Sequence, residues 1–168
     1  NHCMTRNILV QPLTAAAFAP FGDVIELSGE PDFIINRGLC GRYHDLVAPE
    51  VGEGRAGISL FKSETRSLPY QLDMMERHPL GSQAFIPMTG DAFLVIVAPD
   101  NNGRPGQPVA FMTSPGQGVN YARNTWHGVL TPLAEPGLFA VIDRIGDGNN
   151  LEEYEFDAPF IITMKDAR

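Results

Sequence analysis

The chain has 168 residues, which is enough for one domain with a sizeable core, so residues 1–168 are interpreted as a single domain. Hydrophobic residues make up 43% and charged residues 19% of the chain, which is ordinary for a globular protein and argues against a disordered one. A net charge of −8 disfavours nucleic acid and anionic membranes as partners, and no apolar run approaches the roughly 20 residues of a membrane-spanning helix.

Cysteine usage and the N-terminus bear on the compartment. The two cysteines, Cys3 and Cys40, form no CxxC pair and no disulfide framework, and Cys40 is interpreted as a structural residue. No secretory signal peptide is recognised, so a reducing cytoplasm is the expected location. Asn1–Cys3 are interpreted as an addition ahead of a native start at Met4.

The first predicted element is a short helix from Thr14 to Phe18. Thr14 is a good N-cap residue, and the three alanines that follow it favour a helix. Pro20 and Gly22 end the helix, because neither residue continues a helix well. The rest of the chain predicts short strands separated by turns rich in Gly and Pro, at 23–27, 33–36, 58–62, 83–88, 92–98, 109–113, 125–130 and 138–143.

Three segments refine this prediction. Residues 93–97 are all apolar over the length of a strand, so this strand is expected to be buried on both faces. Residues 52–57 match the string GxGxxG, but a strand-like segment follows where a dinucleotide site needs a helix, so we interpret them as a turn. The apolar segment 159–164 is expected to pack on the protein's own domain or on a second subunit. Together the elements predict an all-β fold, a jelly-roll β-barrel with a few short helices.

Two segments resemble the paired motifs of cupin β-barrels, whose residues point into one barrel pocket. In the first segment, His78 occupies the position of the second motif histidine and Gln83 that of the motif acid, while Glu76 stands where the first histidine is usual. In the second segment, residues 118–127, His127 matches the single motif histidine. The barrel is therefore expected to be cupin-like.

The residues of these motifs can carry chemistry. Glu76 and His78 share a face of an extended segment, because side chains two residues apart point the same way, and His127 joins them across the barrel. With Gln83 they offer imidazoles, a carboxylate and an amide oxygen, a set that suits a divalent metal. His78, His127 and Glu76 are also the candidate catalytic residues, because imidazole and a buried carboxyl exchange protons near neutral pH. The alternative is a set of hydrogen-bonded side chains in an ordinary core.

Six residues are candidates for binding an anionic substrate in this acidic protein. Arg42 and Arg123 are the first choices for a carboxylate, because a guanidinium binds it through two hydrogen bonds. The other four candidates carry aromatic or amide side chains: Tyr43, Gln83, Tyr121 and Trp126. A regular strand would turn Trp126 away from the face that carries its neighbour His127. A plain surface or core role is the alternative for each of them.

Beyond these motifs, consecutive blocks along most of the chain resemble the ureidoglycolate lyase family, formerly called ureidoglycolate hydrolase. The blocks are Pro12-Leu13-Thr14 with Phe18, Phe21-Gly22-Asp23-Val24-Ile25-Glu26, Asn36 with Gly38-Leu39, Arg42-Tyr43-His44-Asp45-Leu46, Glu76 to Gly81, Gln83 to Met88, Gly118 to Tyr121, Arg123-Asn124, Trp126-His127 and Ile142-Asp143-Arg144. The resemblance implies a cupin-like barrel, a homodimer, and a lyase that cleaves (S)-ureidoglycolate to glyoxylate and urea in the allantoin branch of purine catabolism. It also implies a divalent metal, usually nickel, which the sequence itself does not demand because Glu76 and Gln83 replace the usual motif residues.

Two other functions stay open at the level of sequence. A hydrolase acting on the same substrate would release ammonia and carbon dioxide, with water attacking the ureido carbonyl in the same pocket. A cupin that only binds a small acid would show no turnover. The sequence also leaves open which of His78 and His127 is the base, and whether the dimer contact is an exposed barrel edge or the segment 159–164.

Overall fold

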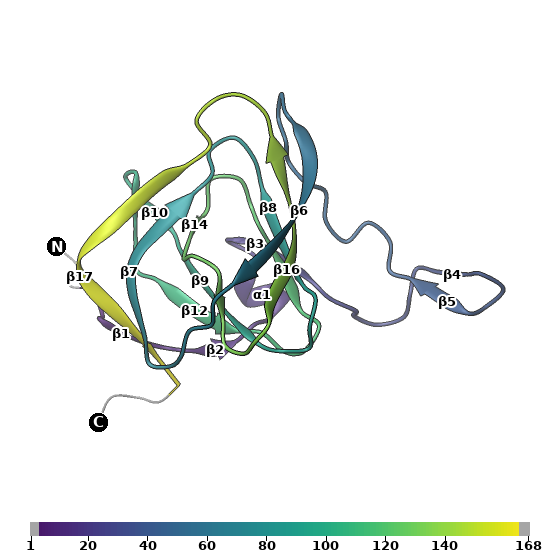
Figure 1. The fold of residues 1–168 in the computed structure, drawn as a ribbon, viewed down its shortest axis with the longest axis horizontal. Coiled ribbons are helices and arrows are strands. Elements are labelled where there is room, and N and C mark those ends of the chain that lie inside the picture. The colour runs from purple at the N-terminus through teal and green to yellow at the C-terminus, as the bar shows by residue number, and fades with distance from the viewer. Residues whose placement is uncertain (1–3, 165–168) are drawn as a thin grey trace.

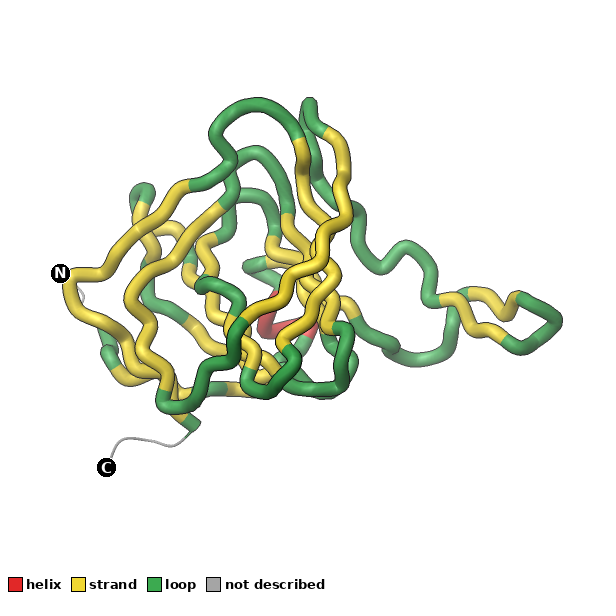
Figure 2. Tube along the Cα trace, in the orientation of Figure 1, coloured by secondary structure: helices red, strands yellow, loops and turns green. Residues whose placement is uncertain are grey.

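The computed structural model describes residues 4–164; Asn1–Cys3, interpreted above as an addition, and residues 165–168 lie outside the described part. Strands dominate the described chain, and one short helix lies near its start (Figure 2). In chain order the elements are β1 (Asn7–Leu9), β2 (Gln11–Pro12), α1 (Ala15–Phe18), β3 (Gly22–Ile25), β4 (Phe33–Ile35), β5 (Cys40–Arg42), β6 (Arg55–Ser63), β7 (Tyr70–Arg77), β8 (Gln83–Pro87), β9 (Phe93–Ala98), β10 (Asp100–Asn101), β11 (Arg104–Pro105), β12 (Val109–Met112), β13 (Gly118–Tyr121), β14 (Trp126–His127), β15 (Thr131–Pro132), β16 (Gly137–Ile145) and β17 (Glu152–Thr163).

Two sheets form the barrel (Figure 1). The larger sheet has the strand order β1-β17-β7-β14-β9-β12-β2, with β15 also paired to β9, and the smaller has the order β3-β13-β8-β16-β6. The arrangement confirms the predicted all-β, cupin-like class. The helix also begins as predicted, because the Thr14 hydroxyl oxygen accepts a hydrogen bond of 3.2 Å from the amide of Ala17. Among the described residues, no helix is long and apolar enough to cross a membrane.

Strand β9 lies between two hydrophobic clusters, as its continuous apolar sequence predicts. Every residue of β9 is buried. Phe93, Val95 and Val97 belong to the cluster between the two sheets, while Leu94, Ile96 and Ala98 belong to a second cluster on the other face of the larger sheet. Because both faces are covered, β9 is a rigid support for the strand that pairs with it, β14.

The C-terminal segment forms part of the barrel. Strand β17 pairs antiparallel with β7 and parallel with β1, and Phe160 and Ile162 are fully buried. The segment 159–164 therefore packs on the protein's own domain, which was the first of the two expectations for it.

Strand β14 is shorter than the predicted strand 125–130, for a reason that the register shows. Trp126 and His127 lie opposite Ala98 and Val97, but pairing with β9 resumes at Thr131 opposite Leu94, one residue out of the first register. One extra residue on this side forms a bulge-like irregularity directly after His127. Irregularities of this kind often lie beside functional sites, because they redirect a side chain.

One element stands apart from the barrel. Strands β4 and β5 pair with each other in a small hairpin, and Figure 1 shows this hairpin, residues 33–42, projecting away from the two sheets. We call it the arm. Its exposed side chains include Phe33, Ile34 and Leu39, of which Leu39 is 88% exposed.

Candidate active site

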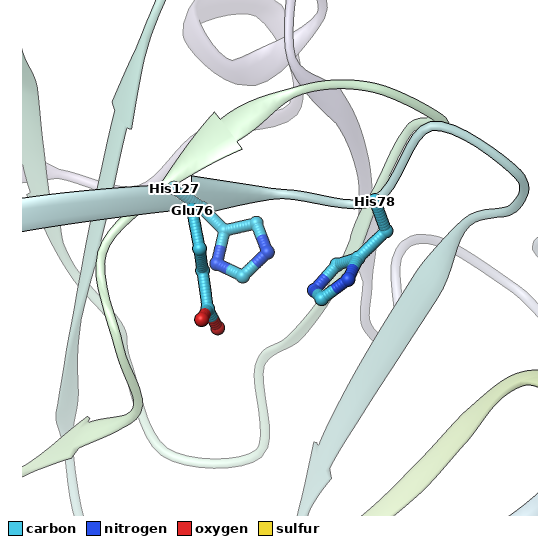
Figure 3. Close-up of side chains that lie close together, drawn as sticks. All are labelled: Glu76, His78 and His127. Atoms are coloured by element: carbon cyan, nitrogen blue, oxygen red, sulfur yellow. The ribbon is translucent and has the colours of Figure 1, made fainter. Parts of the chain in front are cut away.

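Three residues of the predicted set converge at one end of the barrel. Glu76 lies near the end of β7, His78 follows that strand directly, and His127 lies opposite Glu76 in β14. One oxygen or nitrogen atom from each of the three lies within 4.8 Å of the other two. Figure 3 shows the three side chains projecting into the same space from the two strands. We call these residues the triad.

Hydrogen bonds set the proton positions on both imidazoles. Nδ1 of His78 lies 2.8 Å from the carbonyl oxygen of Asn150, and Nδ1 of His127 lies 2.9 Å from that of Gly128. A carbonyl only accepts, so each Nδ1 carries a proton. Both Nε2 atoms are buried and have no hydrogen-bond partner among the described residues. The triad therefore places two unpartnered imidazole nitrogens close to a carboxyl group.

Burial also controls the charge of the triad. It raises the pKa of Glu76, an effect that attraction to His78 reduces and repulsion from Glu153 increases. Burial lowers the pKa of His127 to about 3; the Gly128 carbonyl opposes this change and His78 adds to it. At neutral pH His127 is therefore a neutral imidazole, the form that binds metals and accepts protons.

Tyr121 fixes the plane of the His127 ring. The two rings are stacked, with centroids 4.3 Å apart and planes at 7°. Burial, and secondarily Glu76, raises the pKa of the Tyr121 phenol, so this hydroxyl stays protonated at neutral pH. The structure thus brings Tyr121, predicted as a substrate-binding residue, against the triad.

Gln83 lies next to Tyr121 on the inner side of the smaller sheet. The register places Gln83 of β8 opposite Tyr121 of β13 on one side and opposite Asp143 of β16 on the other. Its amide nitrogen Nε2 donates a 3.1 Å hydrogen bond to Oδ2 of Asp143, and its oxygen Oε1 is buried without a partner among the described residues. Tyr121 also stacks on His127, so it connects Gln83 and Asp143 with the triad.

Trp126 lies away from the triad, as strand alternation predicts. Its ring belongs to the second hydrophobic cluster, and its indole nitrogen donates to Oδ1 of Asp100 at 3.0 Å. The guanidinium of Arg77 lies 4.4 Å from the ring centroid and forms ion pairs with Asp100 and Glu152. These contacts hold β14 in place from the side opposite His127.

The structure places the two candidate arginines differently. Arg42 is exposed at the end of the arm's second strand, and the Tyr43 hydroxyl that follows donates to the Gly29 carbonyl at 2.9 Å. Figure 1 shows that the arm, which includes β5, projects away from β7 and β14, the strands that carry Glu76 and His127. Arg123 donates to the carbonyl of Pro79, directly after His78, and lines an open pocket of about 310 Å³ with Leu80 and Arg144.

Two residues beside the site were not among the predicted ones. Asn150 accepts from His78 through its carbonyl and from the Leu80 amide through its side chain, which fixes the loop that carries His78. Asp143 holds Gln83. Asn150 is 72 residues from His78 and acts mainly through its backbone, so its residue type carries no signal of the contact. Asp143 carries a weak signal, because it is the one acidic residue of the mostly apolar strand β16.

Known proteins resemble this chain over most of its length. A sequence model of the family described as "Ureidoglycolate lyase" matches residues 5–163. A Rhodobacter capsulatus protein named ureidoglycolate lyase is 58% identical over 92% of this chain and 97% of its own length. A Chelativorans protein of the same name is 56% identical over 95% of this chain and 98% of its own, and "Ureidoglycolate lyase 2" of Rhizobium meliloti is 57% identical over 90% and 94%. With the predicted resemblance, these matches show that the chain belongs to the ureidoglycolate lyase family.

Proposed function

We propose that this protein is a ureidoglycolate lyase, which cleaves (S)-ureidoglycolate to glyoxylate and urea in allantoin degradation, a branch of purine catabolism. Family membership supports the substrate. The observation that carries the chemistry is the triad, in which two unpartnered imidazole nitrogens and a carboxyl of raised pKa lie close together. A cytoplasmic location completes the proposal, and the free thiol of Cys40 supports it.

The reaction is an elimination on one carbon, which bears a hydroxyl, a carboxylate and the ureido nitrogen. A base takes the hydroxyl proton, and the O–H electron pair becomes the second bond of the glyoxylate carbonyl. The C–N bond breaks, its electron pair stays on nitrogen, and that nitrogen takes a proton as urea leaves. No water is consumed, so one proton carrier is sufficient.

Glu76 is the proton carrier in this scheme. Because burial raises its pKa, its carboxylate is a stronger base than that of an ordinary glutamate, and the resulting acid stays close to the departing nitrogen. His127 gives no proton here, since it is a neutral imidazole whose only ring proton lies on Nδ1 toward the Gly128 carbonyl. In this scheme His78 and His127 accept or ligate through Nε2.

A divalent cation fits between the three side chains. Two neutral imidazole nitrogens and a carboxylate oxygen are common ligands of such ions, and neither nitrogen has another partner among the described residues. His78, His127 and one oxygen of Glu76 would hold the cation, and nickel is the ion that the family resemblance suggests. Gln83, expected from the sequence as a further ligand, is assigned to the substrate instead. When bound, it would act as a Lewis acid toward the substrate oxygens. The carbonyls of Asn150 and Gly128 orient both imidazoles as outer partners of metal ligands do.

The remaining candidates are proposed to bind the substrate. Arg123 is the proposed partner of the carboxylate, because its neighbour Asn124 donates a 2.9 Å hydrogen bond to the His78 carbonyl and so keeps this segment beside the triad. The Tyr121 hydroxyl and the Gln83 amide face the hydroxyl and ureido ends. Arg42 and Tyr43 contribute only where the arm reaches a second subunit. Trp126 acts indirectly, by supporting β14.

The working form in this proposal is a homodimer, and the outer face of the smaller sheet supports it. Strand β6 turns Ile58 and Leu60 outward, and these side chains are 78% and 70% exposed. The register places Ile142 and Ala140 of β16 beside them, with Ile86 of β8 next to Ala140. An antiparallel sheet normally presents polar residues to water, so an apolar outer face indicates an interface.

The arm supports the same conclusion, because its strands pair only with each other among the described residues. A lone two-stranded hairpin is marginally stable in water, so packing against a second copy would stabilise it. A two-fold axis would let both copies use the same surfaces. Light scattering of the wild-type protein is expected to give the mass of a dimer, Leu60→Lys a monomer, and the matched control Leu9→Lys, which alters an exposed residue of the larger sheet, a dimer. A monomeric wild-type protein at micromolar concentration contradicts this part of the proposal.

Stereoselective turnover tests the proposed function. Purified protein supplied with nickel or manganese is incubated separately with (S)- and (R)-ureidoglycolate, and glyoxylate is measured against the spontaneous rate. We expect release from the (S) substrate alone. Absence of glyoxylate above the spontaneous rate contradicts the proposal, and thermal stabilisation by ureidoglycolate without turnover would favour the binding-only alternative.

A further inference from the structure

Gln83 has a buried amide oxygen that nothing in the described protein uses. The side chain is 7% exposed, and Oε1 has no hydrogen-bond partner among the described residues. Leaving a buried polar atom unpaired costs on the order of 1–3 kcal/mol, so such an atom in a pocket indicates that a ligand completes it. Gln83 lies opposite Tyr121 in the sheet and Tyr121 stacks on His127, so one residue connects Gln83 with the triad.

Asp143 determines which end of this amide faces the pocket. A carboxylate oxygen only accepts hydrogen bonds, so only the NH₂ end of Gln83 can face Asp143, at the observed 3.1 Å. The carbonyl end must then point the other way. The two residues are directly opposite each other in the ladder between β8 and β16, so their backbones also hold this pair in place.

We propose that Asp143 is a positioning residue, which fixes Gln83 so that Oε1 accepts a hydrogen bond from the N–H groups of the ureido leaving group. The inference rests on the proposed function. It assigns recognition of the ureido end, rather than the carboxylate end, to this pair. A fixed acceptor favours a leaving group with N–H donors and disfavours one without them, because the buried oxygen would then stay unpaired.

A double-mutant cycle on the metal-supplied enzyme tests this role. The variants are Asp143→Asn, Gln83→Ala and the double variant. Asparagine has nearly the shape of aspartate but can also donate, so it lets the Gln83 amide turn around. We expect Asp143→Asn to lower kcat/KM for (S)-ureidoglycolate about 10- to 100-fold, and to add less than about twofold in the Gln83→Ala background, since the orientation then no longer matters.

Two further measurements separate positioning from a general structural role. Glyoxylate lacks the ureido group, so its inhibition constant is expected to stay within about twofold of the wild-type value in Asp143→Asn. The bound metal content is expected to be unchanged. An unchanged kcat/KM, an equal loss in the Gln83→Ala background, weaker glyoxylate inhibition or a lost metal would each overturn the inference. The wild-type enzyme in the same experiment reports separately on the proposed function, because its turnover does not depend on how the variants behave.

Discussion

Replacement of His127 by alanine separates the contribution of this side chain to stability from its contribution to turnover. The side chain is 1% exposed, stacks on Tyr121 and donates to the Gly128 carbonyl. Losing the stacking and the hydrogen bond costs about 0.5–1.5 kcal/mol each. Removing the unpaired buried Nε2 returns about 1–3 kcal/mol, while the cavity adds a further cost. The first two effects and the third largely cancel, so the cavity decides the result, and the free energy of unfolding is expected to fall by about 2–5 kcal/mol. A domain of ordinary stability stays folded after such a loss.

Turnover is expected to respond much more strongly. Without Nε2 the pocket loses one of its two lone pairs, and we expect kcat for His127→Ala to fall by about 10²-fold or more, equivalent to about 2.7 kcal/mol of transition-state stabilisation. Val141→Ala is the matched control, because it removes a fully buried side chain elsewhere in the barrel and leaves the triad intact. Glyoxylate release and urea unfolding of both variants are compared with the wild-type protein. A folded His127→Ala protein with near wild-type kcat would remove His127 from the mechanism.

Three further predictions concern the charge and metal of the triad. Glu76→Gln keeps the shape of the side chain and removes the proton carrier, so kcat is expected to fall at least about 10²-fold with no loss of thermal stability; retained kcat refutes the assignment. Dialysis against a chelator should abolish turnover, and adding a divalent cation should restore it. The cation should also raise Tm of the wild-type protein, and much less that of His127→Ala. Full activity with no bound metal refutes the metal site. The pKa of His127 is lower in the folded protein than in the unfolded chain, so acid protonates the unfolded chain first. In the metal-free protein the free energy of unfolding is therefore highest above about pH 6.5 and decreases as pH falls toward 3. Urea unfolding at pH 7.5 and 5 should therefore show a smaller acid-induced loss in His127→Ala than in wild type, and equal losses contradict the cause given for the shift.

The convergence of the triad followed from local rules. Residues two apart on a strand share a face, which placed Glu76 with His78. For His127 the prediction depended on the resemblance to the second cupin motif. Alternation also turned Trp126 to the far side of β14. The contact of His78 with Asn150 was out of reach, because a backbone carbonyl from a distant loop makes it and any residue type could supply that group. The position of Arg42 could not be predicted either, because among the described residues the arm pairs with no strand of the barrel. No sequence pattern indicates the direction in which the arm projects.

The fold shows the same division between local and long-range effects. The apolar run 93–97 correctly predicted a strand buried on both faces, because a continuous apolar run is visible in the sequence without knowing which strands pair with it. The prediction 125–130 exceeded the two-residue β14, since a register shift depends on how β9 and β15 pair. Strand β7 was not predicted, because Met74 and Met75 interrupt its alternation of apolar and polar residues. Pairing on both sides, with β14 and β17, forms this strand despite its weak local pattern.

Product stoichiometry tests the central claim most directly. Wild-type protein is incubated with (S)-ureidoglycolate, and glyoxylate, urea and ammonia are followed in one time course with the spontaneous reaction subtracted. Elimination through the triad predicts glyoxylate and urea in equal amounts without ammonia, because the C–N bond at the hydroxyl-bearing carbon is the bond that breaks. Glyoxylate with ammonia and no urea would contradict the claim, since it would show that water attacks the ureido carbonyl and that the enzyme is a hydrolase.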